Sequence, residues 1–266
     1  MTRIYEQIRD FWDTQPCGTT HLDLDPNSRK YFIEFDKFFE VFYPYYFPFL
    51  DLESMRGKRV MEIGLGSGAS LHRIAGVAGA CYGLDLSGET IRLNQIRQRY
   101  FGTKVNLIHA SATDIPLADN SLDVVVSVGC IHHIPDIQNA VNEIRRVLKP
   151  GGQFKGMVYY KNSYRYRVYI PIIMEMSRRW WGQSKTREEW VNTMYDGEGN
   201  PYGMVYSRAE VSTIFQGFKN FKFSTENFVG EELLPRFGGK IPRSVWLATL
   251  GKVAGLDLYF TARADK

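Results

Sequence analysis

Cysteine is scarce in this sequence, and long apolar runs are missing. Its 266 residues include three cysteines, Cys17, Cys81 and Cys130, which stand far apart with no C-x-x-C spacing. Neither a metal site nor a disulfide framework is therefore expected. No apolar run reaches the roughly 18 residues of a transmembrane helix, and the polar first residues do not resemble a secretory leader. These absences favour a cytoplasmic protein without a bound metal.

A strong excess of charge is also missing. The sequence has 33 Lys and Arg residues and 29 Asp and Glu residues, which gives a formal net charge of +4. Domains that bind nucleic acids usually carry a much larger positive charge. We therefore expect no nucleic-acid partner, and an RNA substrate is the weaker alternative. Aromatic residues, by contrast, make up 14% of the chain, which is high for a soluble protein.

What the sequence does contain is a glycine-rich turn that organises the rest of the chain. Residues 59–70 read R-V-M-E-I-G-L-G-S-G-A-S, an apolar run that leads into Gly64, Gly66 and Gly68. Glycine lets the backbone turn sharply and approach a ligand closely. A helix that begins just after the turn adds its positive N-terminal end. A strand, a glycine loop and a helix in this order bind adenine-containing cofactors in open α/β sheets.

Strand and helix patterns alternate on either side of this turn. Apolar and β-branched runs predict strands at 59–63, 80–84, 105–109, 122–127, 154–160, 221–228 and 256–264. Helices are expected at 69–77, 87–100, 137–148 and 207–216. The alternation predicts an α/β protein with a Rossmann-like, mostly parallel, seven-stranded sheet.

Two segments interrupt the alternation and divide the chain. Residues 1–57 hold helical patterns and many aromatic side chains, and we expect them to form an N-terminal aromatic helical cap. Residues 161–206 carry an aromatic and basic helical pattern without a strand signal, and we expect a helical lid inserted after the fifth strand. The cofactor-binding core would span 58–160, and residues 207–266 would complete the sheet.

The glycine loop is compatible with two kinds of cofactor. Gly64-x-Gly66-x-x-Ala69, with Asp85 about 20 residues further on, satisfies the dinucleotide fingerprint. Glu62, however, lies inside the strand, where a buried acid is costly unless it is paired. A cofactor with a cationic amino-acid tail would offset that charge, whereas a pyrophosphate would be repelled. S-adenosylmethionine, with its ammonium and sulfonium charges, therefore fits better than a nicotinamide dinucleotide.

Four motifs together resemble those of the class I S-adenosylmethionine-dependent methyltransferases, in the small-molecule and quinone-type subgroup called type 11. They are E-I-G-L-G-S-G at 62–68, G-L-D-L-S at 83–87, A-T-D-I-P-L at 112–117 with N-S-L-D at 120–123, and R-V-L-K-P-G-G at 146–152. The resemblance covers about residues 58–160. It implies an enzyme that uses S-adenosylmethionine, with a last strand antiparallel to the rest of the sheet.

The same resemblance implies which residues contact the cofactor. The glycines would contact its methionine part, Asp85 its ribose hydroxyls and Asp114 its adenine amino group. Glu62 would orient the methionine end directly or through the loop and water. The full set of expected cofactor-binding residues is Glu62, Gly64, Leu65, Gly66, Gly68, Asp85, Leu86, Ala112, Thr113, Asp114 and Val128.

Candidate catalytic residues follow the fourth strand, where the acceptor meets the methyl group in this fold. Methyl transfer is an in-line displacement, and alignment supplies most of its catalysis. A general base is needed only when the acceptor must lose a proton. His132 and His133 are candidates because imidazole titrates near neutral pH. The alternative is that they only brace the turn, and Cys130 is expected to be a packing residue.

The acceptor is expected to lie among the aromatic side chains that follow. Tyr159, Tyr160 and Tyr164 are the candidate substrate-binding residues, and they suit a small aromatic or apolar organic acceptor methylated at O or N. Trp180 and Trp181 beside two arginines are also typical of a peripheral membrane contact, unless this helix only covers the domain. Two other functions stay open: an NAD(P)-dependent oxidoreductase, and a non-catalytic S-adenosylmethionine-binding partner protein.

Overall fold

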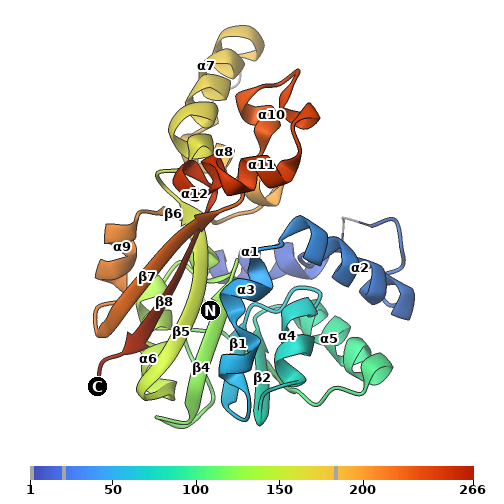
Figure 1. Cartoon of the computed structure of the whole chain (residues 1–266), viewed down its shortest axis with the longest axis vertical. Coiled ribbons are helices and arrows are strands. Elements are labelled where there is room, and N and C mark those ends of the chain that lie inside the picture. Colours follow the sequence, from blue (N-terminus) through green and yellow to red (C-terminus); the bar gives the residue numbers. More distant parts are fainter. Residues whose placement is uncertain (1–2, 20–21, 183–184) are drawn as a thin grey trace.

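The protein is built around one mixed β-sheet (Figure 1). The computed structural model describes residues 3–19, 22–182 and 185–266. The strands are β1 (Arg59–Ile63), β2 (Ala80–Asp85), β3 (Asn106–His109), β4 (Leu122–Val128), β5 (Leu148–Tyr160), β6 (Val205–Tyr206), β7 (Phe218–Glu226) and β8 (Asp257–Ala264). Their order is β3-β2-β1-β4-β5-β8-β7, and β8 is antiparallel to both of its neighbours. The expected sheet is confirmed, with β6 as an addition that was too short to predict.

Helices cover both faces of the sheet, as the alternation predicts. One face carries α6 (Ile137–Val147) and α9 (Arg208–Ile214), and the other carries α3 (Tyr46–Leu50), α4 (Ala69–Ala75) and α5 (Gly88–Phe101). Strand side chains point alternately to the two faces, so Met61 joins one core and Val60 the other. The sheet is therefore buried between two apolar cores, and its carboxyl edge is free to form a site.

The N-terminal residues form the expected aromatic cap. Its helical elements are α1 (Arg3–Thr14), α2 (Arg29–Phe42), α3 and the 3-10 helix η1 (Leu52–Met55). Ser28 begins α2 because its side chain accepts a hydrogen bond from the backbone N–H of Tyr31. The Tyr31, Phe32 and Phe35 side chains are buried in a cluster that includes residues of α4 and α5. The cap thus rests on the helices that follow the first two strands.

A second group of helices stands beyond the carboxyl ends of the parallel strands, at the upper end of Figure 1. We call it the helical lobe, and it consists of residues 161–204 and 227–256. Its elements are η3 (Arg165–Tyr169), α7 (Ile170–Trp181), α8 (Arg187–Asp196), α10 (Gly230–Leu233), η4 (Gly238–Lys240), α11 (Arg243–Ala248) and α12 (Leu250–Ala254). An ion pair of 2.6 Å between Arg165 and Glu232 joins the two segments. The first segment lies within residues 161–206, which the sequence predicts as an inserted helical lid, whereas the second lies within residues 207–266, which were expected only to complete the sheet.

The K-P-G-G motif forms a bulge inside β5. Leu122 pairs with Leu148, but Val124 pairs with Gln153, so the residues between Leu148 and Gln153 have no regular partners on β4. Lys149 holds the bulge to the facing strand through an ion pair of 2.6 Å. The bulge sets the register of the long strand that carries Tyr159 to the carboxyl edge.

Candidate cofactor and acceptor site

The glycine loop joins β1 to α4 at the carboxyl edge of the sheet. Gly64, Gly66 and Gly68 have φ angles of 80°, 49° and 77°, in the left-handed region that other residues rarely adopt. A Cβ on Gly64 would lie 2.3 Å from Cys130 Cβ, and one on Gly68 would lie 2.1 Å from Asn94 Oδ1. The loop therefore requires glycine for its own shape as well as for the approach of a ligand.

Asp85, the last residue of β2, is tied to the glycine loop. Its Oδ2 accepts a hydrogen bond from Leu65 N at 2.8 Å, and its Oδ1 accepts one from Ser87 N at 2.9 Å. Burial outweighs these bonds and raises the pKa of Asp85 to about 6. A carboxylate oxygen accepts more than one hydrogen bond, and Asp85 is only partly buried. The carboxylate therefore keeps the capacity to bind two ribose hydroxyls.

Glu62 lies inside β1 and only 2% of its surface is exposed. Its Oε1 accepts a hydrogen bond from Ser70 Oγ, whereas its Oε2 has no hydrogen-bond partner among the described residues. Burial raises the pKa of Glu62 to about 8, and the bond from Ser70 opposes this shift. An unpaired buried carboxyl oxygen is costly. A cationic group at the glycine loop would offset that cost, so this site fits a cofactor with ammonium and sulfonium charges.

We expect the affinity for S-adenosylmethionine to depend on the protonation of Glu62. The pKa of about 8 keeps this carboxyl mostly protonated at neutral pH, whereas a cationic ligand favours its ionised form. Binding should therefore release a proton, and affinity should rise between about pH 7 and about pH 8. Calorimetry in buffers of different ionisation enthalpy measures the released proton. Glu62→Gln should flatten this dependence and the exposed control Glu53→Gln should not; equal slopes in all three proteins would contradict the assignment.

The remaining expected cofactor residues lie along the same edge of the sheet. They are Leu65, Leu86, Ala112, Thr113, Asp114 and Val128. Each one ends or follows one of the strands β1 to β4, whose carboxyl ends are neighbours in a parallel sheet. Thr113 Oγ1 lies 2.7 Å from Ser111 Oγ, while Asp114 is exposed to solvent. The structure therefore brings the predicted set together, with Asp114 at its open side.

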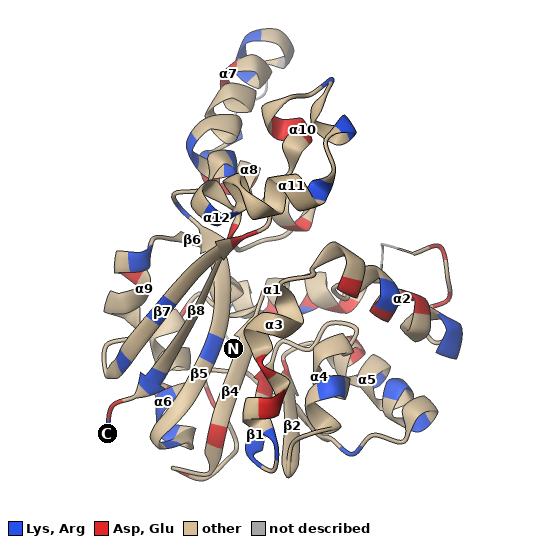
Figure 2. Ribbon diagram, in the orientation of Figure 1, with Lys and Arg blue, Asp and Glu red and all other residues tan. Residues whose placement is uncertain are grey.

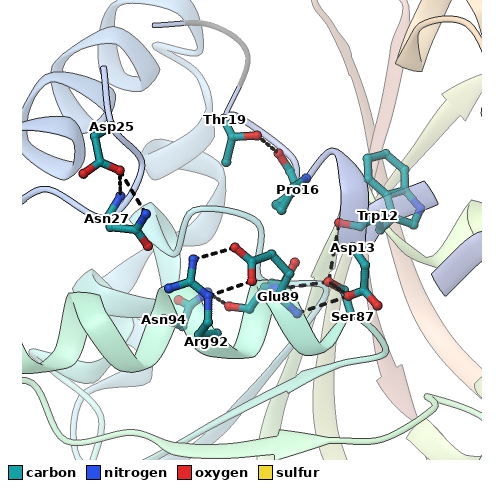
Figure 3. A network of polar contacts seen from close by, with 11 residues as sticks. Trp12, Asp13, Pro16, Thr19, Asp25, Asn27, Ser87, Glu89, Arg92 and Asn94 are labelled. Atoms are coloured by element: carbon teal, nitrogen blue, oxygen red, sulfur yellow. Dashed lines mark hydrogen bonds and ion pairs between the residues drawn. The ribbon is translucent and has the colours of Figure 1, made fainter. Parts of the chain in front are cut away.

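An N-terminal arm, residues 3–19, runs beside the beginning of α5, where Trp12 and Asp13 lie next to Ser87 and Glu89 (Figure 3). Asp13 Oδ1 accepts hydrogen bonds from Ser87 Oγ at 2.7 Å and from Glu89 N at 3.1 Å. These partners stand at the beginning of α5, where the helix dipole favours a carboxylate. Asp13 was not among the predicted site residues, because nothing local in the sequence ties it to a helix 74 residues away.

The arm also touches the glycine loop and one of the candidate bases. The Cys17 carbonyl accepts a hydrogen bond from Ser67 Oγ at 3.1 Å, and the Tyr31 hydroxyl lies 2.7 Å from the same Ser67 oxygen. The Trp12 ring packs edge-on against His133, with 5.3 Å between ring centroids. The arm thus contacts both the glycine loop and His133.

His132 and His133 form the 3-10 helix η2 (Ile131–His133) after β4. His133 Nδ1 lies 2.8 Å from the Tyr202 carbonyl oxygen, so Nδ1 carries a hydrogen and Nε2 is left to accept a proton. His133 Nε2 lies 3.6 Å from Asp196 Oδ1. His132 is fully buried, and burial lowers its pKa well below the ordinary value. His133 is therefore the better placed of the two as a base.

A buried polar cluster connects the histidines to the helical lobe. The Tyr159 hydroxyl donates to Asp196 Oδ1, and Asn200 Nδ2 donates to Asp196 Oδ2 at 2.8 Å. The Tyr159 ring lies 3.9 Å from His132 and 4.1 Å from Tyr195, measured between centroids. Burial raises the pKa of Tyr159 well above its ordinary value, so the hydroxyl stays protonated. Asp196 ends α8, and the lobe thus contributes a carboxylate that the motifs did not reveal.

The other two candidate acceptor residues lie elsewhere. Tyr160 follows Tyr159 on β5 and therefore points to the opposite face, where it joins the core beneath α6 and α9. Tyr164 lies in the helical lobe, with its hydroxyl 3.4 Å from the Glu232 carbonyl and its ring beside Phe228. The structure brings Tyr159 to the histidines and places Tyr160 and Tyr164 away from them.

Comparison with known proteins agrees with this geometry. Residues 61–155, which run from β1 into β5, match a family described as Methyltransferase domain. The "Probable S-adenosylmethionine-dependent methyltransferase" of Mycolicibacterium smegmatis is 40% identical over 98 residues, which cover 37% of either chain. Residues 61–155 are therefore similar to the methyltransferase domain of S-adenosylmethionine-dependent enzymes, and the resemblance drawn from the four motifs is confirmed.

Two further comparisons extend beyond the shared core. The demethylmenaquinone methyltransferase of Staphylococcus haemolyticus is 26% identical over 151 residues, 53% of this chain and 62% of the relative. The chain spans less than two thirds of the length of both curated relatives. A chain from the complex of the Haloferax volcanii Trm112 methyltransferase activator with a methyltransferase superposes with a TM-score of 0.64 over 97% of both chains. At 20% identity this likeness shows the fold alone.

Proposed function

We propose that the protein transfers a methyl group from S-adenosylmethionine to a small aromatic or apolar organic acceptor, at oxygen or nitrogen. The observation that supports this best is that the acids beside the glycine loop and the histidines after β4 lie at the same edge of the sheet. Glu62 and Asp85 stand at the glycine loop, and the arm that contacts this loop packs on His133. Demethylmenaquinone, in the name of the Staphylococcus relative, supports an acceptor of quinone type.

The residues of the chain would bind, orient and shield the reactants. When bound, S-adenosylmethionine supplies a methyl group on a positively charged sulfur, so alignment is the main task of the protein. Asp85 would hold the ribose and Glu62 the cationic end. If the acceptor is a hydroxyl, His133 would accept its proton at Nε2, and the carboxylate of Asp196, 3.6 Å away, would stabilise the imidazolium that forms.

Each of the four expected segments would have a separate role in binding the cofactor and the acceptor. Residues 58–160 would bind the cofactor, residues 1–57 would cover it, residues 161–206 would form the acceptor lid, and residues 207–266 would complete the sheet. The partner would be a small-molecule acceptor met in the cytoplasm, with no nucleic acid involved. The hydrogen bond between Tyr159 and Asp196, whose other oxygen is held by Asn200, supports a lid that takes part in the acceptor site.

A single-turnover assay tests the proposed activity. The protein is mixed with S-adenosylmethionine labelled in its methyl group and with a small-molecule extract, and the products are separated. We expect the label to appear in an apolar or aromatic extract component. Label that stays entirely in tightly bound cofactor would favour a non-catalytic binding protein. Binding of NAD(P) in place of S-adenosylmethionine would favour the oxidoreductase and contradict the proposal.

A further inference from the structure

Large apolar side chains are exposed mainly on the helical lobe. Within the described residues, nine large hydrophobic side chains are exposed, and seven of them belong to the lobe. These seven are Val168, Ile172, Trp180, Leu234, Phe237, Val245 and Val253. Scattered exposed apolar residues are normal on a protein surface, but a concentration on one part of it marks an interaction site.

The lobe also carries the positive charge of the chain. Its two segments hold 11 Lys and Arg residues and 7 Asp and Glu residues, which accounts for the whole formal net charge of +4. Figure 2 shows Lys and Arg on α7 and on the segment between α10 and α11. Neither Arg179 nor Arg236 forms an ion pair with the described residues, whereas Arg178 pairs with Glu175. Unneutralised guanidinium groups therefore face solvent here.

Both features meet at two tips of the lobe. One tip is the end of α7, with S-R-R-W-W-G at 177–182, and the other lies between α10 and α11, with P-R-F-G-G-K at 235–240. Both lie at the end of the long axis remote from the sheet (Figure 1). Each combines arginine with an exposed aromatic ring, 63% exposed for Trp180 and 60% for Phe237. The side chain of Trp181 lies outside the described residues.

We propose that these two tips dock on the surface of an anionic lipid bilayer. Trp and Phe rings favour the boundary between headgroups and acyl chains, and Lys and Arg residues are attracted to an anionic leaflet. No helix in the described ranges is long and apolar enough to cross a bilayer, so the lobe would rest on the surface. A second copy of the chain fits less well, because two basic tips repel each other. This docking does not depend on the proposed methyl transfer.

Vesicle sedimentation of the full chain tests the docking. The vesicles contain either phosphatidylcholine alone or equal parts of phosphatidylcholine and phosphatidylglycerol. We expect the protein to sediment with the anionic vesicles and not with the neutral ones, and to be released by salt. The double variant Arg179→Gln/Arg236→Gln should lower the partition coefficient at least about tenfold. Phe237→Ser should lower it several-fold as well.

Matched substitutions at the far side of the molecule show whether the tips are responsible. Arg99 and Lys104 are exposed at the end of α5 and just beyond it, and α5 lies remote from the lobe (Figure 1). Arg99→Gln/Lys104→Gln removes the same charge and should leave vesicle binding unchanged. Equal losses in the two double variants, or no binding to anionic vesicles, would overturn the proposal. Because sedimentation needs neither cofactor nor turnover, its failure is distinguishable from a failure of the methyltransferase activity.

Discussion

Replacing Asp85 by alanine should weaken the affinity for S-adenosylmethionine about hundredfold. The carboxylate is placed to accept hydrogen bonds from two ribose hydroxyls, and a hydrogen bond to a charged group contributes ~1.5–3 kcal/mol. The substitution also removes the acceptor for Leu65 N and Ser87 N, which hold the glycine loop against β2. Titration calorimetry of both proteins with the cofactor measures the change in Kd directly.

Two other substitutions separate the ribose contact from a general loss of structure. Asp85→Asn keeps the size of the side chain and one acceptor oxygen, so its Kd should lie between those of the wild type and Asp85→Ala. Asp114→Ala removes a solvent-exposed carboxylate. It should weaken the affinity for S-adenosylmethionine less than Asp85→Ala does, because water competes with the adenine amino group for an exposed carboxylate. Thermal melting shows that each variant is folded. Wild-type affinity in folded Asp85→Ala would show that the ribose lies elsewhere.

His133→Ala should lower kcat by about a hundredfold or more with a hydroxyl acceptor, while the affinity for the cofactor stays unchanged. A positioned general base contributes about 10²–10⁴-fold to the rate, and His133 has its Nε2 available because Nδ1 is held by the Tyr202 carbonyl. Single-turnover rates at saturating cofactor isolate the chemical step from binding.

A second substitution, measured together with His133→Ala, tests the role of Asp196. Asp196→Asn keeps the size of the side chain and one of the two acceptor oxygens that receive hydrogen bonds from Tyr159 and Asn200, but it removes the negative charge near His133, so kcat should fall about tenfold. His72→Ala removes a histidine from α4 that packs on Phe101 and should leave kcat unchanged. If His133→Ala and Asp196→Asn both turn over at the wild-type rate, alignment alone performs the reaction.

The core of the fold and the placement of the glycine loop at the sheet edge were predictable because their signals are local. Apolar runs and glycine spacing identify β1, β2 and the loop between them within about 30 residues. The positions of Glu62 and Asp85 beside the loop could be predicted because each has a fixed place in the sequence relative to it. The structure adds the physical reasons: an unpaired buried oxygen on Glu62, and backbone N–H groups that fix Asp85.

The contacts around His133 were not predictable because they join distant parts of the chain. Asp196 reaches His133 from the end of a lobe helix, and Asp13 reaches Ser87 across 74 residues. Both acids look like ordinary surface residues in the sequence. The helices of the second lobe segment, α10, η4, α11 and α12, have only three to six residues, which is too short for a clear periodic pattern. The position of Tyr160 was hard to predict for another reason. Neighbouring side chains on a strand point to opposite faces of the sheet, so Tyr160 does not lie beside the histidines as Tyr159 does.

The orientation of S-adenosylmethionine in the site tests the central claim most directly, and a crystal structure of the complex would measure it. We expect the methionine end at the glycine loop near Glu62, the ribose hydroxyls on Asp85, and the sulfonium methyl group directed toward His133 and Tyr159. A methyl group directed toward Asp114, or a cofactor bound away from Asp85, would contradict it.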